Sequence, residues 1–176
     1  VAEYLQTDKS NVRVIAAPAG GAFGGKIGNM VNREAAKIAE LTETPIKLVY
    51  SRKDQFQRSS RFKAAVTIDI TTGVNADGEI IARKINCYED LAEGSTYTYN
   101  IPNTLTRAYK ADLPYSRAVV RGTSYVQTRF AIESNVDMVA KQLGINPFEF
   151  RRKNVLYPAY VQLLDKCEEM IGYGNI

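Results

Sequence analysis

The sequence contains no histidine, no tryptophan and only two cysteines among its 176 residues. Histidine is the commonest general base and a common metal ligand, so its absence excludes a Ser-His-Asp or Cys-His catalytic arrangement within this chain. Cys87 and Cys167 do not belong to a Cys-x-x-Cys motif, and the chain therefore carries no ligand set of its own for zinc or an iron–sulfur cluster. Two reduced thiols are typical of a cytosolic protein, and we predict a cytoplasmic location.

Long apolar segments and strong charge are also missing. No apolar run approaches the roughly 20 residues of a membrane-spanning helix, and we expect no membrane association. The net charge is only +4, from 23 basic and 19 acidic residues. A solvated basic surface explains this better than a nucleic-acid site, so no nucleic-acid partner is expected. Because the first residue is valine rather than methionine, we expect the chain to be part of a larger protein.

The first part of the chain has the pattern of strand, glycine loop, helix and strand. Residues 11–17 are β-rich and run into the glycine-rich residues 19–26. Residues 29–41 combine good helix formers with an apolar spacing that predicts a helix. Residues 46–50, with the sequence Ile-Lys-Leu-Val-Tyr, predict a short strand.

The middle of the chain predicts a β-hairpin followed by a further strand. Residues 62–72 and 78–88 alternate in part between apolar and polar side chains, which is typical of half-buried strands. Asp77-Gly78, between the two segments, is a strong signal for a tight hairpin turn. Residues 104–111 predict another strand.

The last third of the chain predicts helices. Residues 125–143 form the longest predicted helix, which Gly144 ends. Asn146 and Pro147 predict the N-cap and first position of a short helix, and residues 161–171 predict a last amphipathic helix. The predicted fold class is α+β, with a mixed or antiparallel sheet that includes a long β-hairpin and carries packed helices. The apolar stripe expected on the longest helix consists of Phe130, Val136, Val139, Ala140 and Leu143.

A glycine-rich loop is the strongest functional signal, with four glycines in residues 20–25. Glycine adopts positive φ angles easily and lets a ligand approach the backbone closely. Consecutive exposed N–H groups form an anion-binding concavity, and the N-terminus of a following helix adds partial positive charge. Phe23, in the middle of the loop, is unusual for a loop that holds only phosphate and indicates an aromatic edge at the mouth of a site.

Several interpretations of this loop stay open from the residues alone. Its spacing differs from the Gly-x-Gly-x-x-Gly of dinucleotide-binding loops, because Gly20 and Gly21 are adjacent. Residues 20–26 fit the spacing of a nucleotide phosphate loop, but Ile27 replaces the Ser or Thr that would bind Mg²⁺. The remaining interpretations are a loop around another phosphate-bearing cofactor and a glycine turn that only permits tight packing.

Four segments resemble, in the correct order, motifs of the xanthine dehydrogenase and aldehyde oxidase family of molybdenum hydroxylases. Residues 20–26 are similar to its Gly-Gly-Gly-Phe-Gly-Gly-Lys loop, and residues 99–103 to its Tyr-x-Ile-Pro-Asn segment. Residues 120–122 resemble its Phe-Arg-Gly stretch, and residues 144–154 its Gly-x-x-Pro…Arg-Arg-Lys-Asn signature. Four motifs in order are far more specific than any one of them.

The resemblance implies a molybdopterin-binding domain over residues 1–157, followed by a helical extension over residues 158–176. In that family the glycine loop and the residues around the arginine contact the cofactor through their backbone, with the phenylalanine beside the metal centre. The intact enzyme hydroxylates an aldehyde or N-heterocycle with water as the oxygen source, and iron–sulfur clusters and FAD lie on other domains or subunits. The residues that inherit the cofactor contacts are Gly20, Gly21, Ala22, Phe23, Gly24, Gly25, Val120 and Arg121.

Three residues are expected to face a small-molecule substrate: Phe23, Ile27 and Thr123. Purine-specific members of the family have Glu in place of Ile27, Phe in place of Thr123, and an arginine in the stretch that here reads Glu89-Asp90-Leu91. These differences argue against xanthine as the substrate. They favour an aldehyde, an N-heteroaromatic acid or a purine bound in another pose.

The resemblance assigns no catalytic residue to this chain, because the catalytic glutamate of the family lies in a later domain. Glu89, Glu93 and Glu133 are available carboxylates, of which Glu133 is expected to have a structural role on its helix. We expect part of a molybdenum-dependent oxidoreductase that is inactive alone, retains no cofactor by itself, and self-associates through surfaces that other domains or subunits cover. Two alternatives stay open: a non-catalytic scaffold or assembly module of the same fold, and an independent nucleotide-binding protein.

Overall fold

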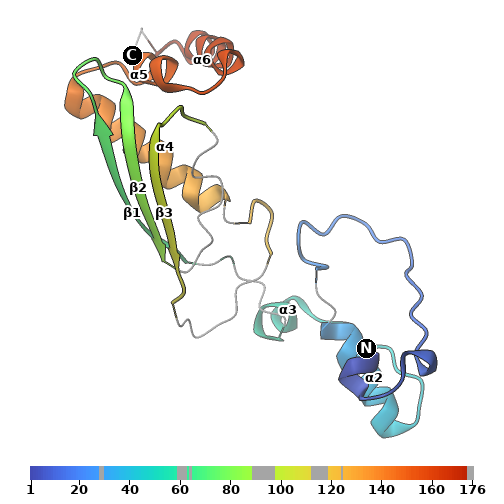
Figure 1. Cartoon of the computed structure of the whole chain (residues 1–176). Helices are drawn as coiled ribbons and strands as arrows, with labels where there is room; N and C mark the ends of the chain where they lie inside the picture. Colours follow the sequence, from blue (N-terminus) through green and yellow to red (C-terminus); the bar gives the residue numbers. More distant parts are fainter. Residues whose placement is uncertain are drawn as a thin grey trace. The chain divides into compact units, whose positions relative to one another are not determined.

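The chain forms two compact units, Val1–Lys63 with Leu113–Thr123 and Ala64–Asp112 with Ser124–Ile176 (Figure 1). The computed structural model describes residues 1–27, 30–58, 63, 65–88, 98–111, 119–123 and 125–173. The second of the two units contains all the strands found among these residues.

The sheet of this second unit has three strands in the order β1-β2-β3. β1 (Thr67–Val74) and β2 (Ile80–Tyr88) form an antiparallel hairpin, and β3 (Asn103–Tyr109) runs parallel to β2. The turn between β1 and β2 contains Gly78 at φ +81°, a left-handed conformation that glycine adopts without strain. The predicted hairpin, its Asp-Gly turn, the third strand and the α+β class with a mixed sheet are confirmed.

A long helix, α4 (Tyr125–Leu143), covers one face of the sheet (Figure 1). Its bounds agree with the predicted helix over residues 125–143. The buried side chains of α4 recur every four residues, a spacing that keeps them on one helical face. They pack against buried sheet residues that include Ile80 and Ile85. The buried residues of α4 are Thr128, Ile132, Val136 and Ala140.

The apolar stripe predicted for this helix is wrong in part. Val136 and Ala140 are buried as expected, and Val139 packs against the core. Phe130, however, is 75% exposed, and Leu143 is also exposed. Phe130 lies two residues from the buried Thr128, which corresponds to about 200° around a helix. The core face is therefore set by Thr128 and Ile132, and Phe130 points away from it.

Two shorter helices follow, and Figure 1 shows them at the end of the sheet where β1 turns into β2. Gly144 ends α4 at φ +68°, as predicted. Asn146 caps α5 (Pro147–Asn154) by accepting hydrogen bonds from the backbone N–H groups of the first turn, also as predicted. α6 (Pro158–Ile171) begins three residues earlier than the predicted segment, because Pro158 occupies its first position.

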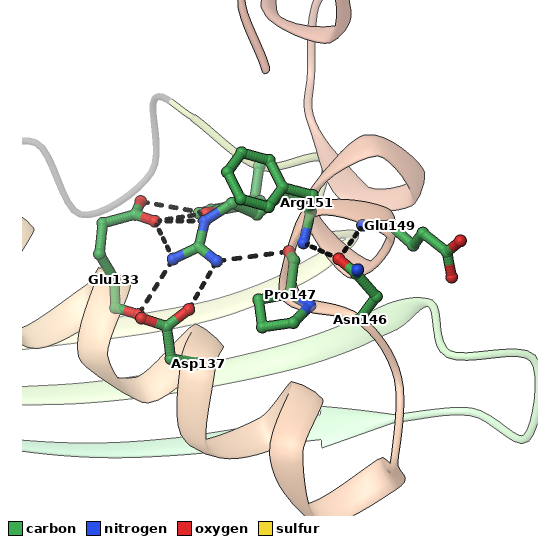
Figure 2. A network of polar contacts seen from close by, with 8 residues as sticks. Glu133, Asp137, Asn146, Pro147, Glu149 and Arg151 are labelled. Carbon is green, nitrogen blue, oxygen red and sulfur yellow. Dashed lines mark hydrogen bonds and ion pairs between the residues drawn. The ribbon is translucent and has the colours of Figure 1, made fainter. Parts of the chain in front are cut away.

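An ion-pair network joins α5 to α4 (Figure 2). The Arg151 guanidinium lies 2.9 Å from a carboxylate oxygen of Glu133 and 2.6 Å from one of Asp137. Tyr99 donates its hydroxyl to the same Glu133 carboxylate at 2.8 Å. Burial and the Glu133 carboxylate raise the pKa of Tyr99, so its hydroxyl remains a donor at neutral pH. The expected structural role of Glu133 is confirmed.

The first unit holds small helices and extended segments. They are α1 (Ala2–Leu5), η1 (Lys9–Asn11), α2 (Met30–Thr42) and α3 (Arg52–Arg58). The predicted helix over residues 29–41 corresponds to α2. α1, η1 and α3 were not predicted, although Ser51 and Asp54 form a capping box at the start of α3 that their spacing in the sequence indicates.

The two strands predicted in this first unit are not formed. Residues 12–21 and 45–51 belong to no strand, although both contain β-branched residues. A strand needs a neighbour that supplies backbone hydrogen bonds, and no other described segment pairs with either one. The prediction was wrong because local composition cannot supply that partner.

Candidate cofactor-binding site

The glycine loop folds into a compact turn at Ala22–Ile27. The backbone N–H of Gly25 donates to the carbonyl of Ala22 at 2.7 Å, and that of Ile27 donates to the carbonyl of Gly24 at 3.0 Å. Phe23 has a φ of +50° and Gly24 a φ of +97°. A left-handed phenylalanine is uncommon and strained, so the surrounding contacts must hold Phe23 in place.

Gly24 has a steric reason to be glycine, in addition to its positive φ. A Cβ atom added at Gly24 would lie 2.2 Å from the carbonyl oxygen of Val119, far inside any allowed contact. The glycine loop and the segment 119–123 therefore touch backbone to backbone. Gly20 differs, because a Cβ added there would have no atom within 4 Å. Tight packing thus explains Gly24 and leaves Gly20 facing open space.

Arg121 and Phe23 form the side-chain contact between the same two segments. The guanidinium carbon of Arg121 lies 5.3 Å from the centre of the Phe23 ring, within the range of a cation–π interaction. Segment 119–123 is itself a tight turn, in which the N–H of Thr123 donates to the carbonyl of Val120 at 2.8 Å. Lys63 donates to the carbonyl of Arg121 at 2.9 Å and thereby helps to hold this turn.

Backbone donors and cations gather around the loop. Among the described residues, the N–H groups of Gly20 and Gly21 have no backbone hydrogen-bond partner, and both residues are exposed. Lys26 donates to the carbonyl of Gly20 at 2.8 Å. Lys26, Lys63 and Arg121 form no ion pair with any carboxylate in the described part of the chain. Amides without a backbone partner, together with cations that pair with no described carboxylate, suit an anionic ligand.

A cavity of about 580 Å³ lies beside the loop within the first unit. Gly25 and Lys26 form part of its wall, and the two segments that were predicted as strands supply Val14, Ile15 and Val49. These three side chains are 67%, 76% and 74% exposed. These side chains give the cavity an apolar part of its wall.

The structure brings together most of the residues expected at the site. Gly24 contacts Val119, and Phe23 contacts Arg121, while Val120 lies between these two residues of the facing segment. Ile27 is 61% exposed, and Thr123 is exposed with a φ of +26°. The residues from Glu89 to Leu91 and Glu93 lie outside the described residues.

Two contributors to the site were missed by sequence reasoning. Val119 is next to the predicted Val120, and only the backbone contact with Gly24 reveals its role. Lys63 lies far from both segments along the chain and carries no motif that would have identified it.

In the described ranges, no three His, Cys, Asp or Glu side chains cluster as metal ligands, and no helix is both long and apolar enough to cross a bilayer.

Comparison with known proteins identifies the class to which this arrangement belongs. Residues 1–155 match the family model of the molybdopterin cofactor-binding domain. Because this match covers most of the chain, the chain belongs to that family. The resemblance to the xanthine dehydrogenase and aldehyde oxidase family is thereby confirmed.

Particular relatives agree with this assignment. The nicotinate dehydrogenase large molybdopterin subunit of Eubacterium barkeri is 29% identical over 170 residues, which cover 88% of this chain and 40% of that protein. The aldehyde oxidoreductase of Megalodesulfovibrio gigas is 28% identical over 174 residues, or 90% of this chain and 19% of that protein. The chain thus spans less than half the length of these relatives.

Solved structures share the fold. The aldehyde oxidoreductase from Desulfovibrio gigas superposes with a TM-score of 0.73 and 24% identity over 86% of this chain and 20% of that chain. The reconstituted CO dehydrogenase from Oligotropha carboxidovorans superposes with a TM-score of 0.80 and 17% identity over 98% of this chain and 26% of that chain. At these identities the likeness establishes the fold alone.

Proposed function

We propose that this chain forms one wall of the molybdopterin site of a molybdenum hydroxylase. The observation that carries the proposal is the contact between the glycine loop and segment 119–123. In the described part of the chain the amides of Gly20 and Gly21 have no backbone partner, and Lys26 and Arg121 both contact the loop. The family membership supports it independently. The catalytic unit is a longer protein, of which residues 1–157 are the cofactor-binding part and residues 158–176 a helical extension.

The residues present fit such a cofactor. Gly20 faces open space, and the adjacent amides and cations suit the negatively charged phosphate of a pterin cofactor. When bound, the cofactor supplies the two-electron oxidation of the substrate carbon. The chain binds and orients it, and supplies no base of its own. The residues proposed to hold the cofactor are Gly20, Gly21, Ala22, Phe23, Gly24, Gly25, Val120 and Arg121.

The substrate is proposed to be an aldehyde or an N-heterocycle, with water as the oxygen source. Relatives include a nicotinate dehydrogenase and an aldehyde oxidoreductase, and Phe23, Ile27 and Thr123 are the proposed substrate-facing residues. Iron–sulfur clusters and FAD are proposed on other domains or subunits, which are the expected partners. The chain alone is expected to be inactive, to retain no cofactor and to self-associate. The cytoplasmic location stays a prediction.

A pair of glycine substitutions tests this function against the scaffold alternative. Gly20→Val should leave the 176-residue chain folded, because its side chain enters open space. In the intact enzyme the same change should lower the molybdenum content at least tenfold, because the added atoms occupy the space of the cofactor. Metal analysis of the purified enzyme measures this. Full molybdenum content in Gly20→Val enzyme would favour a scaffold that does not use the loop for binding.

Gly24→Ala is the matched comparison for this test. Its methyl group collides with the Val119 carbonyl, and its φ of +97° is unfavourable for alanine. It should therefore lower the thermal midpoint of the chain even without cofactor, whereas Gly20→Val should not. The two variants together separate loss of binding from loss of packing.

A further inference from the structure

We propose that Arg121 is a positioning residue, whose guanidinium holds the Phe23 ring over Gly21 and thereby sets the opening at Gly20. This inference deepens the proposed function and depends on it for its significance in catalysis. In this proposal the Arg121 side chain contacts the Phe23 ring, while the backbone amides of the glycine loop face the cofactor.

The ring of Phe23 has two neighbours. The guanidinium carbon of Arg121 is 5.3 Å from its centre. Ring atoms also lie 3.4 Å from the position that a Cβ of Gly21 would occupy. The ring therefore lies over Gly21, next to the open space at Gly20. Any movement of the ring changes the width of that space.

Phe23 is 68% exposed, so burial contributes little to its position. Its left-handed φ of +50° is unfavourable, and such a conformation persists only when the surroundings determine it. The backbone is held by the contact of Gly24 with Val119. The Arg121 guanidinium is the charged group that contacts the side chain itself.

Hydrogen bonds to backbone carbonyls hold the segment that carries Arg121. Lys63 donates to the Arg121 carbonyl at 2.9 Å, and the N–H of Thr123 donates to the Val120 carbonyl. Among the described residues, no carboxylate pairs with the Arg121 guanidinium. The loop is therefore arranged before the cofactor arrives, which reduces the ordering needed on binding.

Arg121→Gln and Arg121→Lys test this assignment by NMR spectroscopy of the 176-residue chain. The Phe23 ring current should shift the Gly21 amide proton and the Arg121 side-chain protons in the unmodified chain. Arg121→Gln should release the ring and move the Gly21 amide toward its random-coil position. Arg121→Lys should retain part of the shift, because an ammonium group also interacts with a ring face. Phe23→Leu should abolish the shift of the Arg121 protons, and Arg13→Gln, an exposed arginine of the same unit, should change neither signal.

In the intact enzyme, Arg121→Gln should raise the substrate KM about two- to fivefold more than Arg121→Lys does, with a smaller change in kcat. An unchanged Gly21 amide shift in Arg121→Gln would overturn the proposal, as would equal KM values for the two variants. Failure of the proposed function gives a different result. In that case the NMR shifts respond as described, but the Gly20→Val enzyme keeps its molybdenum.

Discussion

The side chain of Asn154 accepts a hydrogen bond from the backbone N–H of Ile80 at 2.7 Å, across 74 positions of the sequence. Its amide nitrogen donates to the carbonyls of Gly78 at 3.0 Å and Phe150 at 2.8 Å. One buried side chain thus joins the end of α5 to the start of β2. Asn154, the last residue of the Arg-Arg-Lys-Asn signature, therefore has a structural role in the second unit.

Asn154→Ala should destabilise the chain by about 2–4 kcal/mol, because it leaves the buried Ile80 N–H and Gly78 carbonyl without their side-chain partner and removes a second donor from the Phe150 carbonyl. Asn154→Asp should be at least as damaging, although it has the same shape, because its carboxylate cannot donate to those carbonyls. Urea unfolding measures both. The exposed Asn103, which donates to the Ile81 carbonyl at 3.0 Å, provides the control, and Asn103→Ala should cost less than about 1 kcal/mol. Equal losses at the two positions would contradict this account.

Arg151→Lys should destabilise the chain by about 1–2 kcal/mol, because a lysine cannot bond Glu133 and Asp137 at once with the fork of a guanidinium. The Arg151 side chain is only 16% exposed, while both carboxylates are more exposed, which limits the loss. Lys166→Met, which removes an exposed pair with Glu169, should change stability by less than about 0.5 kcal/mol. The prediction is wrong if urea unfolding shows the same effect for both.

Arg83→Met should be neutral or should stabilise the chain by up to about 2 kcal/mol. Arg83 is 3% exposed, and in the described part of the chain neither terminal nitrogen of its guanidinium has a hydrogen-bond partner. Burial lowers the pKa of Arg83, which is the signature of an unfavourable buried charge. Arg83→Lys keeps the charge and should destabilise, because an ammonium group is more strongly hydrated. A loss above about 2 kcal/mol in Arg83→Met would show that the guanidinium is paired in solution.

The start of α3 should be sensitive to acid. Hydrogen bonds from the hydroxyl and N–H of Ser51 hold the pKa of the Asp54 carboxyl below its ordinary value of 3.8. A lowered pKa means that the ionised form stabilises the folded state. This contribution is fully present above pH 3.8 and is lost as the pH falls through the lower pKa of the folded chain. NMR titration of Asp54 should give a midpoint below that of an Asp54 peptide. In Asp54→Asn, α3 should be equally weak at neutral and acid pH.

Local signals predicted the second unit well. The Asp77-Gly78 turn, Gly144 at the end of α4 and Asn146 at the start of α5 each act within a few residues, so their effects follow from short stretches of sequence. The buried face of α4 did not follow from composition. Thr128 is buried and Phe130 exposed because the helix must match the sheet that it covers, and the sheet's shape depends on residues distant in the chain.

For the candidate site, the order of the motifs along the chain was enough to predict the correct family. The order of motifs does not specify which side chains touch. Two segments in different parts of the chain meet where Gly24 contacts Val119 and Arg121 contacts Phe23. Lys63 donates to the Arg121 carbonyl without any local motif.

The sequence by itself determined the hairpin, the helix ends and the family, because turns, caps and motif order depend on neighbouring residues. Only the tertiary structure decided which glycine serves packing and which faces open space. Likewise, the β-rich residues 12–17 form no strand, because a strand requires backbone partners that composition cannot provide. These outcomes depend on contacts between distant segments, whose geometry no local pattern encodes.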